Sequence, residues 1–164
     1  MTNDRSANGL RRSPFNDLSV EQVEFLKSEI HAIGADENVF KFNLGVGTSY
    51  SDELDVIYVR SDVLPDGNST HPRDLMSPRA VLAHEYYGHR AFRGTALAKG
   101  AWNDEFRASY IAAKNAANLT DEDRAYLVMD AITRASDAGI SIRYNDFMRG
   151  VLHGDDNKSS NYQK

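Results

Sequence analysis

Two of the five histidines in this chain of 164 residues lie close together, in the segment His-Glu-Tyr-Tyr-Gly-His over residues 84–89. Imidazole and carboxylate groups in such proximity are typical ligands of a divalent metal ion. The chain contains no cysteine, so a metal site must use histidine, aspartate and glutamate. The other histidines, at positions 31, 71 and 153, have no partner at ligand-like spacing. His84 and His89 are therefore the first candidates for metal ligands.

The spacing of these two histidines is one residue longer than in the zincin signature His-Glu-x-x-His, which the segment resembles. Residues four apart on a regular α-helix differ by about 40° around the axis, whereas residues five apart differ by about 140°. A single π-type turn, with about 4.4 residues per turn, reduces the five-residue separation to near 50°. We therefore expect a widened helical turn here, and Gly88 is the residue best suited to such a distortion.

A third ligand is expected from two adjacent acids downstream, Asp104 and Glu105, at the start of a segment with an apolar helical stripe. A catalytic zinc site uses three protein ligands and leaves the fourth position to water. One of the two acids can face the metal. Its neighbour can then form a hydrogen bond with a ligand histidine and fix its tautomer.

The strings His-Glu-x-x-Gly-His and Asp-Glu-x-Arg-Ala resemble the active site of the dipeptidyl-peptidase III family, which are gluzincin-type zinc peptidases. The resemblance covers roughly a tenth of the chain. It implies one zinc ion per chain, with His84, His89 and Glu105 as ligands. It also implies that Glu85 is the general base and that Asp104 supports a ligand histidine. The enzymes of that family are several times longer, so their substrate cleft and exopeptidase specificity are not expected here.

The reaction that such a site predicts is hydrolysis of peptide bonds in a peptide or protein substrate. The water bound to zinc has its pKa lowered to near 7, and Glu85 would take its proton during attack on the carbonyl. Two alternatives remain open. The first is a non-catalytic, zinc-stabilised binding module, in which the metal contributes folding energy. The second is an interaction protein of a toxin or phage system with a fortuitous motif.

The elements that must position these residues are a helix and two strands before the motif. Ser19 with Gln22 forms a capping-box pattern at the start of a helix that Gly34 ends. Strand-like patterns follow at 39–44 and 55–59, joined by a loop that begins at 45–49. We expect strand 39–44 to be an edge strand to which a substrate peptide could add.

After the strands the chain reads as mostly helical. Ser77 followed by Pro78 opens the motif helix, expected over 78–93. Asn103 and Thr120 are candidate N-caps of two further helices, and Gly139 follows the second of them. We expect an α+β fold, a minimal zincin-like single domain with a small sheet packed beside the active-site helix and further helices behind it. Its expected parts are a flexible arm (1–17), the metallopeptidase domain (18–150) and a flexible tail (151–164).

Composition excludes several other classes of protein. The net charge is −5 and no basic block occurs, so nucleic acid is not an expected partner. The apolar runs are far shorter than the roughly 20 residues that a membrane helix needs, so no membrane association is expected. The first residues lack the apolar stretch of a signal peptide. We therefore expect a cytoplasmic protein or a delivered effector, and the sequence gives no indication of its oligomeric state.

Overall fold

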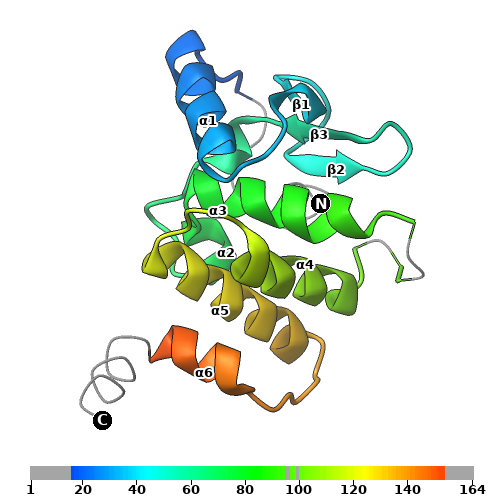
Figure 1. The fold of residues 1–164 in the computed structure, drawn as a ribbon, viewed down its shortest axis with the longest axis vertical. Coiled ribbons are helices and arrows are strands. Elements are labelled where there is room, and N and C mark those ends of the chain that lie inside the picture. The colour runs from blue at the N-terminus through cyan, green and yellow to red at the C-terminus, as the bar shows by residue number, and fades with distance from the viewer. Residues whose placement is uncertain (1–15, 95–96, 99, 154–164) are drawn as a thin grey trace.

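The structure is a computed structural model that describes residues 16–94, 97–98 and 100–153. Most of the arm expected over 1–17 and of the tail expected over 151–164 lies outside these described residues. Figure 1 shows a small sheet above a stack of helices. The main elements are α1 (Val20–Ala32), β1 (Phe40–Phe42), β2 (Ser49–Ser51), β3 (Val56–Val59), α2 (Pro72–Leu75), α3 (Pro78–Ala83), α4 (Trp102–Asn115), α5 (Asp121–Asp137) and α6 (Asp146–Leu152).

The sheet has the strand order β1-β3-β2. β1 runs parallel to β3, with Phe40 opposite Ile57, and β2 runs antiparallel to it, with Tyr50 opposite Ile57. β1 is therefore an edge strand, as expected for residues 39–44. β2 is the second edge strand and it contacts the helix that carries the two histidines.

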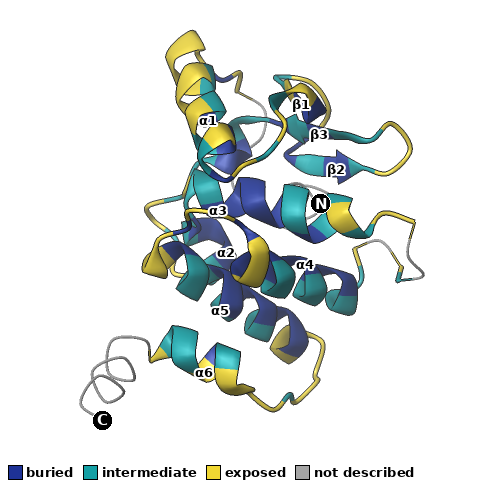
Figure 2. Cartoon of the chain, in the orientation of Figure 1, coloured by how far each residue is buried: buried dark blue, intermediate teal, exposed yellow. Residues whose placement is uncertain are grey.

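The helices form the layers below the sheet. α3 and its continuation lie directly under the strands, and α4 and α5 pack beneath them (Figure 1). The core runs through all of these layers, as the dark blue segments of Figure 2 show. It includes the fully buried side chains of Ile30, Ile57, Met76, Leu82 and Leu127. Because the strands and the helices α1, α3, α4, α5 and α6 all contribute side chains to this core, burial in it is the main force that holds the helices under the sheet.

Most of the expected helix caps are confirmed. Ser19 and Thr120 each accept a hydrogen bond from the backbone at the third helical position, and both capping boxes are complete. Gly139, with φ of +76°, follows α5 as expected. The expected cap at Asn103 is wrong, because α4 already begins at Trp102 and Ala101 occupies its N-cap position.

The α+β class expected from the sequence is confirmed. A four-residue helix, α2, was not expected: His71 is its N-cap, and the ring Nδ1 accepts from the Arg73 amide. Among the described residues, no helix combines the length and the apolar character that crossing a membrane would require.

Candidate metal site

The two histidines of the motif are brought together by a π-helix. Ser77 caps α3 and Pro78 occupies its first turn, and α3 continues without a break into a π-helix over His84–His89. A short 3-10 helix, Arg90–Phe92, follows. The widened turn expected from the five-residue spacing is therefore confirmed. It places the imidazole rings of His84 and His89 with their centroids 4.7 Å apart.

Gly88 serves this turn in a different way from the one expected. Its φ is not positive, so glycine is not needed there for its conformational freedom. Instead, a Cβ at position 88 would lie 2.3 Å from the carbonyl oxygen of Ala108 and 2.6 Å from its Cα. The absence of a side chain therefore lets the backbone of α4 lie directly against the π-helix. This close contact brings the acid pair of α4 to the histidines.

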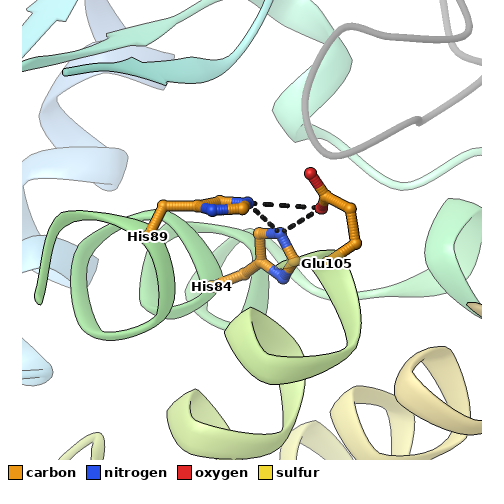
Figure 3. A group of neighbouring side chains, drawn as sticks. All are labelled: His84, His89 and Glu105. Carbon is orange, nitrogen blue, oxygen red and sulfur yellow. Dashed lines mark hydrogen bonds and ion pairs between the residues drawn. The ribbon is translucent and has the colours of Figure 1, made fainter. Parts of the chain in front are cut away.

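Three potential ligand atoms converge where α4 meets the π-helix (Figure 3). Nε2 of His84 lies 3.1 Å from Nε2 of His89, and Oε1 of Glu105 lies 3.0 Å and 3.2 Å from these two atoms. A metal ion with bonds of about 2 Å holds neighbouring ligand atoms about 3 Å apart. His84 is fully buried and Glu105 is 8% exposed. The three residues therefore form a buried group that could hold a metal ion.

The charges around this group favour an anionic Glu105. Burial alone would raise the pKa of Glu105, but His89, His84 and Arg134 together hold it well below its ordinary value. Burial lowers the pKa of His84, which favours a neutral imidazole. Burial would also lower the pKa of His89, but Glu105, Glu85 and Asp104 raise it to about 9. The metal-free site therefore carries one carboxylate, one neutral imidazole and one protonated imidazole at neutral pH.

Glu85 lies beside the ligand group without belonging to it. Its side chain is 1% exposed, and its Oε2 atom has no hydrogen-bond partner within the described part of the chain. Burial is the main cause that raises the pKa of Glu85 to about 8. An unpaired carboxyl oxygen inside a protein is costly, and such a group at a cluster of titratable residues is a frequent feature of functional sites.

Asp104 lies on the other side of His89. Its Oδ2 atom is 3.7 Å from Nδ1 of His89, which is an ion-pair distance and longer than a hydrogen bond. The same oxygen accepts a hydrogen bond from the Gly100 amide at 3.0 Å. Arg107 forms an ion pair with the other oxygen, Oδ1, at 3.6 Å.

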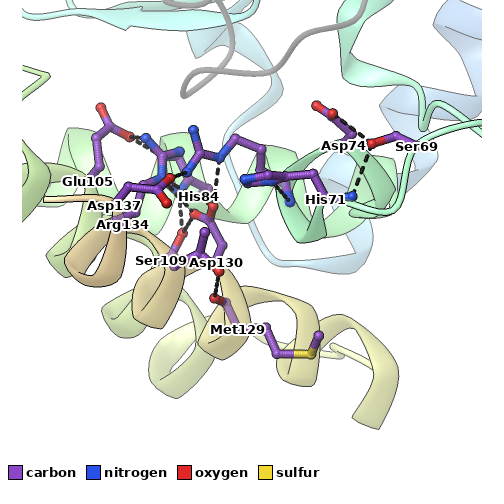
Figure 4. Close-up of polar contacts among 12 residues, drawn as sticks. Ser69, His71, Asp74, His84, Glu105, Ser109, Met129, Asp130, Arg134 and Asp137 are labelled. Atoms are coloured by element: carbon purple, nitrogen blue, oxygen red, sulfur yellow. Dashed lines mark hydrogen bonds and ion pairs between the residues drawn. The ribbon is translucent and has the colours of Figure 1, made fainter. Parts of the chain in front are cut away.

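A buried polar network behind the site was not expected from the sequence (Figure 4). Ser109 on α4 contacts His84, and Asp130 and Arg134 on α5 extend the network. Arg134 also reaches Oε1 of Glu105 with its Nη1 atom at 3.4 Å. One signal was available: Ser109 follows Glu105 by four residues, which places both on one face of a helix. Nothing in the sequence connects Asp130 to that face.

The tyrosines between the ligand positions are packing residues. Tyr86 stacks on Phe40 of β1, and the Tyr87 hydroxyl donates to the Ile33 carbonyl. Tyr110 contacts Phe147 and accepts a hydrogen bond from Asn145, on the side of α4 that faces α6.

Comparisons with protein-family models, with curated proteins and with solved structures found no match to this chain.

Proposed function

We propose that this protein is a zinc-dependent metallopeptidase with a minimal zincin-like domain, in which His84, His89 and Glu105 hold one zinc ion. The observation that carries the proposal is the convergence of the three ligand atoms to within 3.2 Å of one another in a buried position. Two imidazoles and one carboxylate are a donor set typical of catalytic zinc sites that keep one position open. Once His89 has lost its proton, as metal binding requires, the set carries a charge of −1, which suits a divalent cation.

Glu85 is the residue that distinguishes a hydrolytic site from a purely structural one. A zinc ion bound by the three ligands supplies Lewis acidity and lowers the pKa of a bound water to near 7. Glu85 neighbours a ligand in sequence, and one of its carboxyl oxygens is buried and has no partner among the residues that the structure describes. It can accept the proton of the attacking water and return it to the leaving amine nitrogen. Amide hydrolysis needs both transfers.

The sheet offers a place for an extended substrate. β2 is an edge strand, and it is packed on the π-helix that carries the histidines. A peptide that pairs with this edge would run alongside the metal site, with affinity from main-chain hydrogen bonds and little dependence on sequence. Peptides and unfolded proteins are therefore the substrates we propose.

The experiment that tests the proposal compares zinc content and peptide hydrolysis in the wild type and in Glu85→Gln. We expect one zinc per chain in both proteins and cleavage of casein or of a mixed-peptide library by the wild type. Loss of the general base should reduce the rate by on the order of 10² to 10⁴. Equal cleavage by both proteins would contradict the assigned role of Glu85. Zinc binding without any cleavage by the wild type would instead identify a metal-stabilised binding module.

A further inference from the structure

The Nδ1 atom of His84, which points away from the proposed metal position, enters a chain of buried hydrogen bonds. It lies 2.8 Å from the hydroxyl oxygen of Ser109, which in turn lies 2.6 Å from Oδ2 of Asp130 (Figure 4). All three side chains are fully buried. Because an ionised carboxylate only accepts hydrogen bonds, the Ser109 hydroxyl donates to Asp130. Ser109 is then left with lone pairs for His84, so this contact favours the proton on Nδ1 of His84. Nε2 can then accept from Nε2 of His89 at 3.1 Å, although Oε1 of Glu105, at 3.0 Å, competes for a proton on the same nitrogen.

Two arginines determine how the Asp130 carboxylate is oriented. Nε of Arg73 donates to Oδ1 of Asp130 at 3.3 Å, and Nε of Arg134 donates to the same oxygen at 3.1 Å and reaches Oδ2 at 3.3 Å. Oδ1 is thus held by both arginines, and Oδ2 is directed at Ser109. The two guanidinium groups also favour the ionised form of this buried acid, which the direction of donation by Ser109 requires.

We propose that Asp130, acting through Ser109, is a positioning residue that places the proton of His84 on Nδ1 and so leaves the Nε2 lone pair free for the metal. A carboxylate that bonds directly to a metal-ligating histidine has this effect in many metal sites, and here a serine hydroxyl transmits it. The inference rests on the proposed function for its consequence, which is metal affinity. The position of the proton, however, is a property of the metal-free protein.

Asp130→Asn tests the proposal because it should reverse the direction of the whole chain. Both arginines donate to the Oδ1 position and Arg134 alone reaches the Oδ2 position, at the longer distance, so we expect the amide oxygen of the substituted side chain to take the Oδ1 place and its NH₂ group to face Ser109. The amide nitrogen then donates to the Ser109 hydroxyl oxygen, and the hydroxyl donates to Nδ1 of His84. The proton of His84 moves to Nε2, where it blocks the lone pair that a metal needs.

The experiment uses the full chain, and its first readout is independent of any metal. Nitrogen-15 spectra of the metal-free protein report which ring nitrogen of His84 is protonated, with the signal assigned by its loss in His84→Gln. We expect protonation of Nδ1 in the wild type and of Nε2 in Asp130→Asn. The second readout is the zinc dissociation constant, measured by competition with a chelator. We expect it to be about 10- to 100-fold weaker in Asp130→Asn, the usual effect of losing such a partner.

Asp123→Asn is the matched control. Asp123 is also a buried acid of α5, and it accepts from the hydroxyl of another serine, Ser77, at 2.6 Å. The Asp123→Asn variant should be less stable than the wild type, with no change in the His84 tautomer or in the zinc dissociation constant. Should Asp130→Asn fail to fold, Ser109→Ala removes the same relay and should weaken zinc binding by a similar factor.

Several outcomes overturn the inference. They are an unchanged His84 tautomer in Asp130→Asn, an equal loss of zinc affinity in Asp123→Asn, and wild-type zinc affinity in Ser109→Ala. A wild type that takes up no zinc overturns the proposed function instead, and the tautomer comparison still decides whether Asp130 places the proton.

Discussion

Nε2 of His84 and Nε2 of His89 lie 3.1 Å apart although five positions separate the two residues along a helix. On a regular α-helix that spacing would direct them about 140° apart. The π-helix brings them together, and α4 adds Oε1 of Glu105 within 3.2 Å of both. All three separations among these ligand-type atoms are 3.2 Å or less, and the atoms come from two elements, so the arrangement depends on each of the three residues.

The first prediction concerns these ligands. His84→Ala and His89→Ala should each lose the zinc that we expect in the wild type, since two remaining ligands bind it too weakly. Zinc at about 100 times its dissociation constant should stabilise the wild type by about 2.7 kcal/mol and should leave both variants unchanged. Elemental analysis of the purified proteins and their melting temperatures with and without zinc provide the measurement. His31→Ala is the control: its side chain is 65% exposed and pairs with Glu37. One zinc per chain in His84→Ala would refute the ligand assignment.

The second prediction is that Glu85 lowers the stability of the metal-free protein as the pH rises. Its pKa is raised from 4.5 to about 8 in the folded state, mainly by burial. Below pH 4.5 the carboxyl group is protonated in both the folded and the unfolded states, so it costs nothing. Between pH 4.5 and about 8 the carboxyl group ionises freely only in the unfolded state. The free energy of unfolding therefore falls by up to about 1.4 kcal/mol per pH unit.

Glu85→Gln removes this cost. Denaturant unfolding of the metal-free proteins should show the variant to be more stable than the wild type, by a margin that grows from about pH 5 to about pH 8. Glu21→Gln, a change at an exposed acid of α1, should give no such trend. A margin independent of pH would contradict the raised pKa. A gain in stability together with a loss of activity would be the expected trade-off at a functional site.

The third prediction concerns the contact between the π-helix and α4. Gly88→Ala places a Cβ 2.3 Å from the Ala108 carbonyl oxygen, a separation that requires the backbone to move. We expect a loss of about 1–3 kcal/mol in the free energy of unfolding, as for overpacking in a core. Zinc affinity should fall as well, because Glu105 lies one turn before Ala108 on the displaced helix.

Gly150→Ala is the control for this change. Gly150 lies within α6, and an added Cβ would have no atom within 4 Å. Alanine in the interior of a helix is more favourable than glycine, so this variant should be slightly more stable than the wild type. Chemical denaturation of the two variants measures both effects. Equal stability of Gly88→Ala and Gly150→Ala would show that the contact at Ala108 is not a tight one.

The fourth prediction is a contribution of Asp55 to stability that acid removes. Hydrogen bonds from Arg90 and Tyr50 are the main causes that lower the pKa of Asp55 to about 2 in the folded protein. Its stabilising effect is therefore complete above about pH 4 and disappears as the pH falls toward 2. Melting temperatures of Asp55→Asn should approach those of the wild type over that range. Asp52→Asn, in the same turn and exposed, should run parallel to the wild type throughout.

The parts of the fold that the sequence predicts are those that local chemistry determines. Ser19 and Thr120 are recognisable as caps because their side chains serve backbone groups three residues away. The π-helix also follows from a local argument, because no regular helix can bring residues five apart onto one ligand position. The sequence does not predict β2, because Tyr50 is the single apolar residue of this strand. β2 forms by pairing with β3.

The rest of the candidate site depends on how the helices pack against one another. His84, His89 and Glu105 could be selected by residue type and spacing, since each lies in a short motif. Asp130 could not, because 20 residues and a change of helix separate it from Ser109, and only the packing of α5 on α4 brings them together. The expected role of Gly88 is wrong: its lack of a side chain makes room for the backbone of Ala108 and is not needed for its own backbone angles.

The contact at Gly88 also limits how this site can change during evolution. A substitution that placed a histidine at position 88 would not give the four-residue spacing, because the backbone of α4 leaves no room there even for a methyl group. Deleting one of the two intervening tyrosines would give that spacing, because it removes the extra residue of the widened turn and leaves a regular helix. The shorter arrangement is therefore reached by loss of one residue and not by a substitution. A descendant of this chain that keeps all six residues of this segment and the packing of the two helices keeps the longer spacing as well.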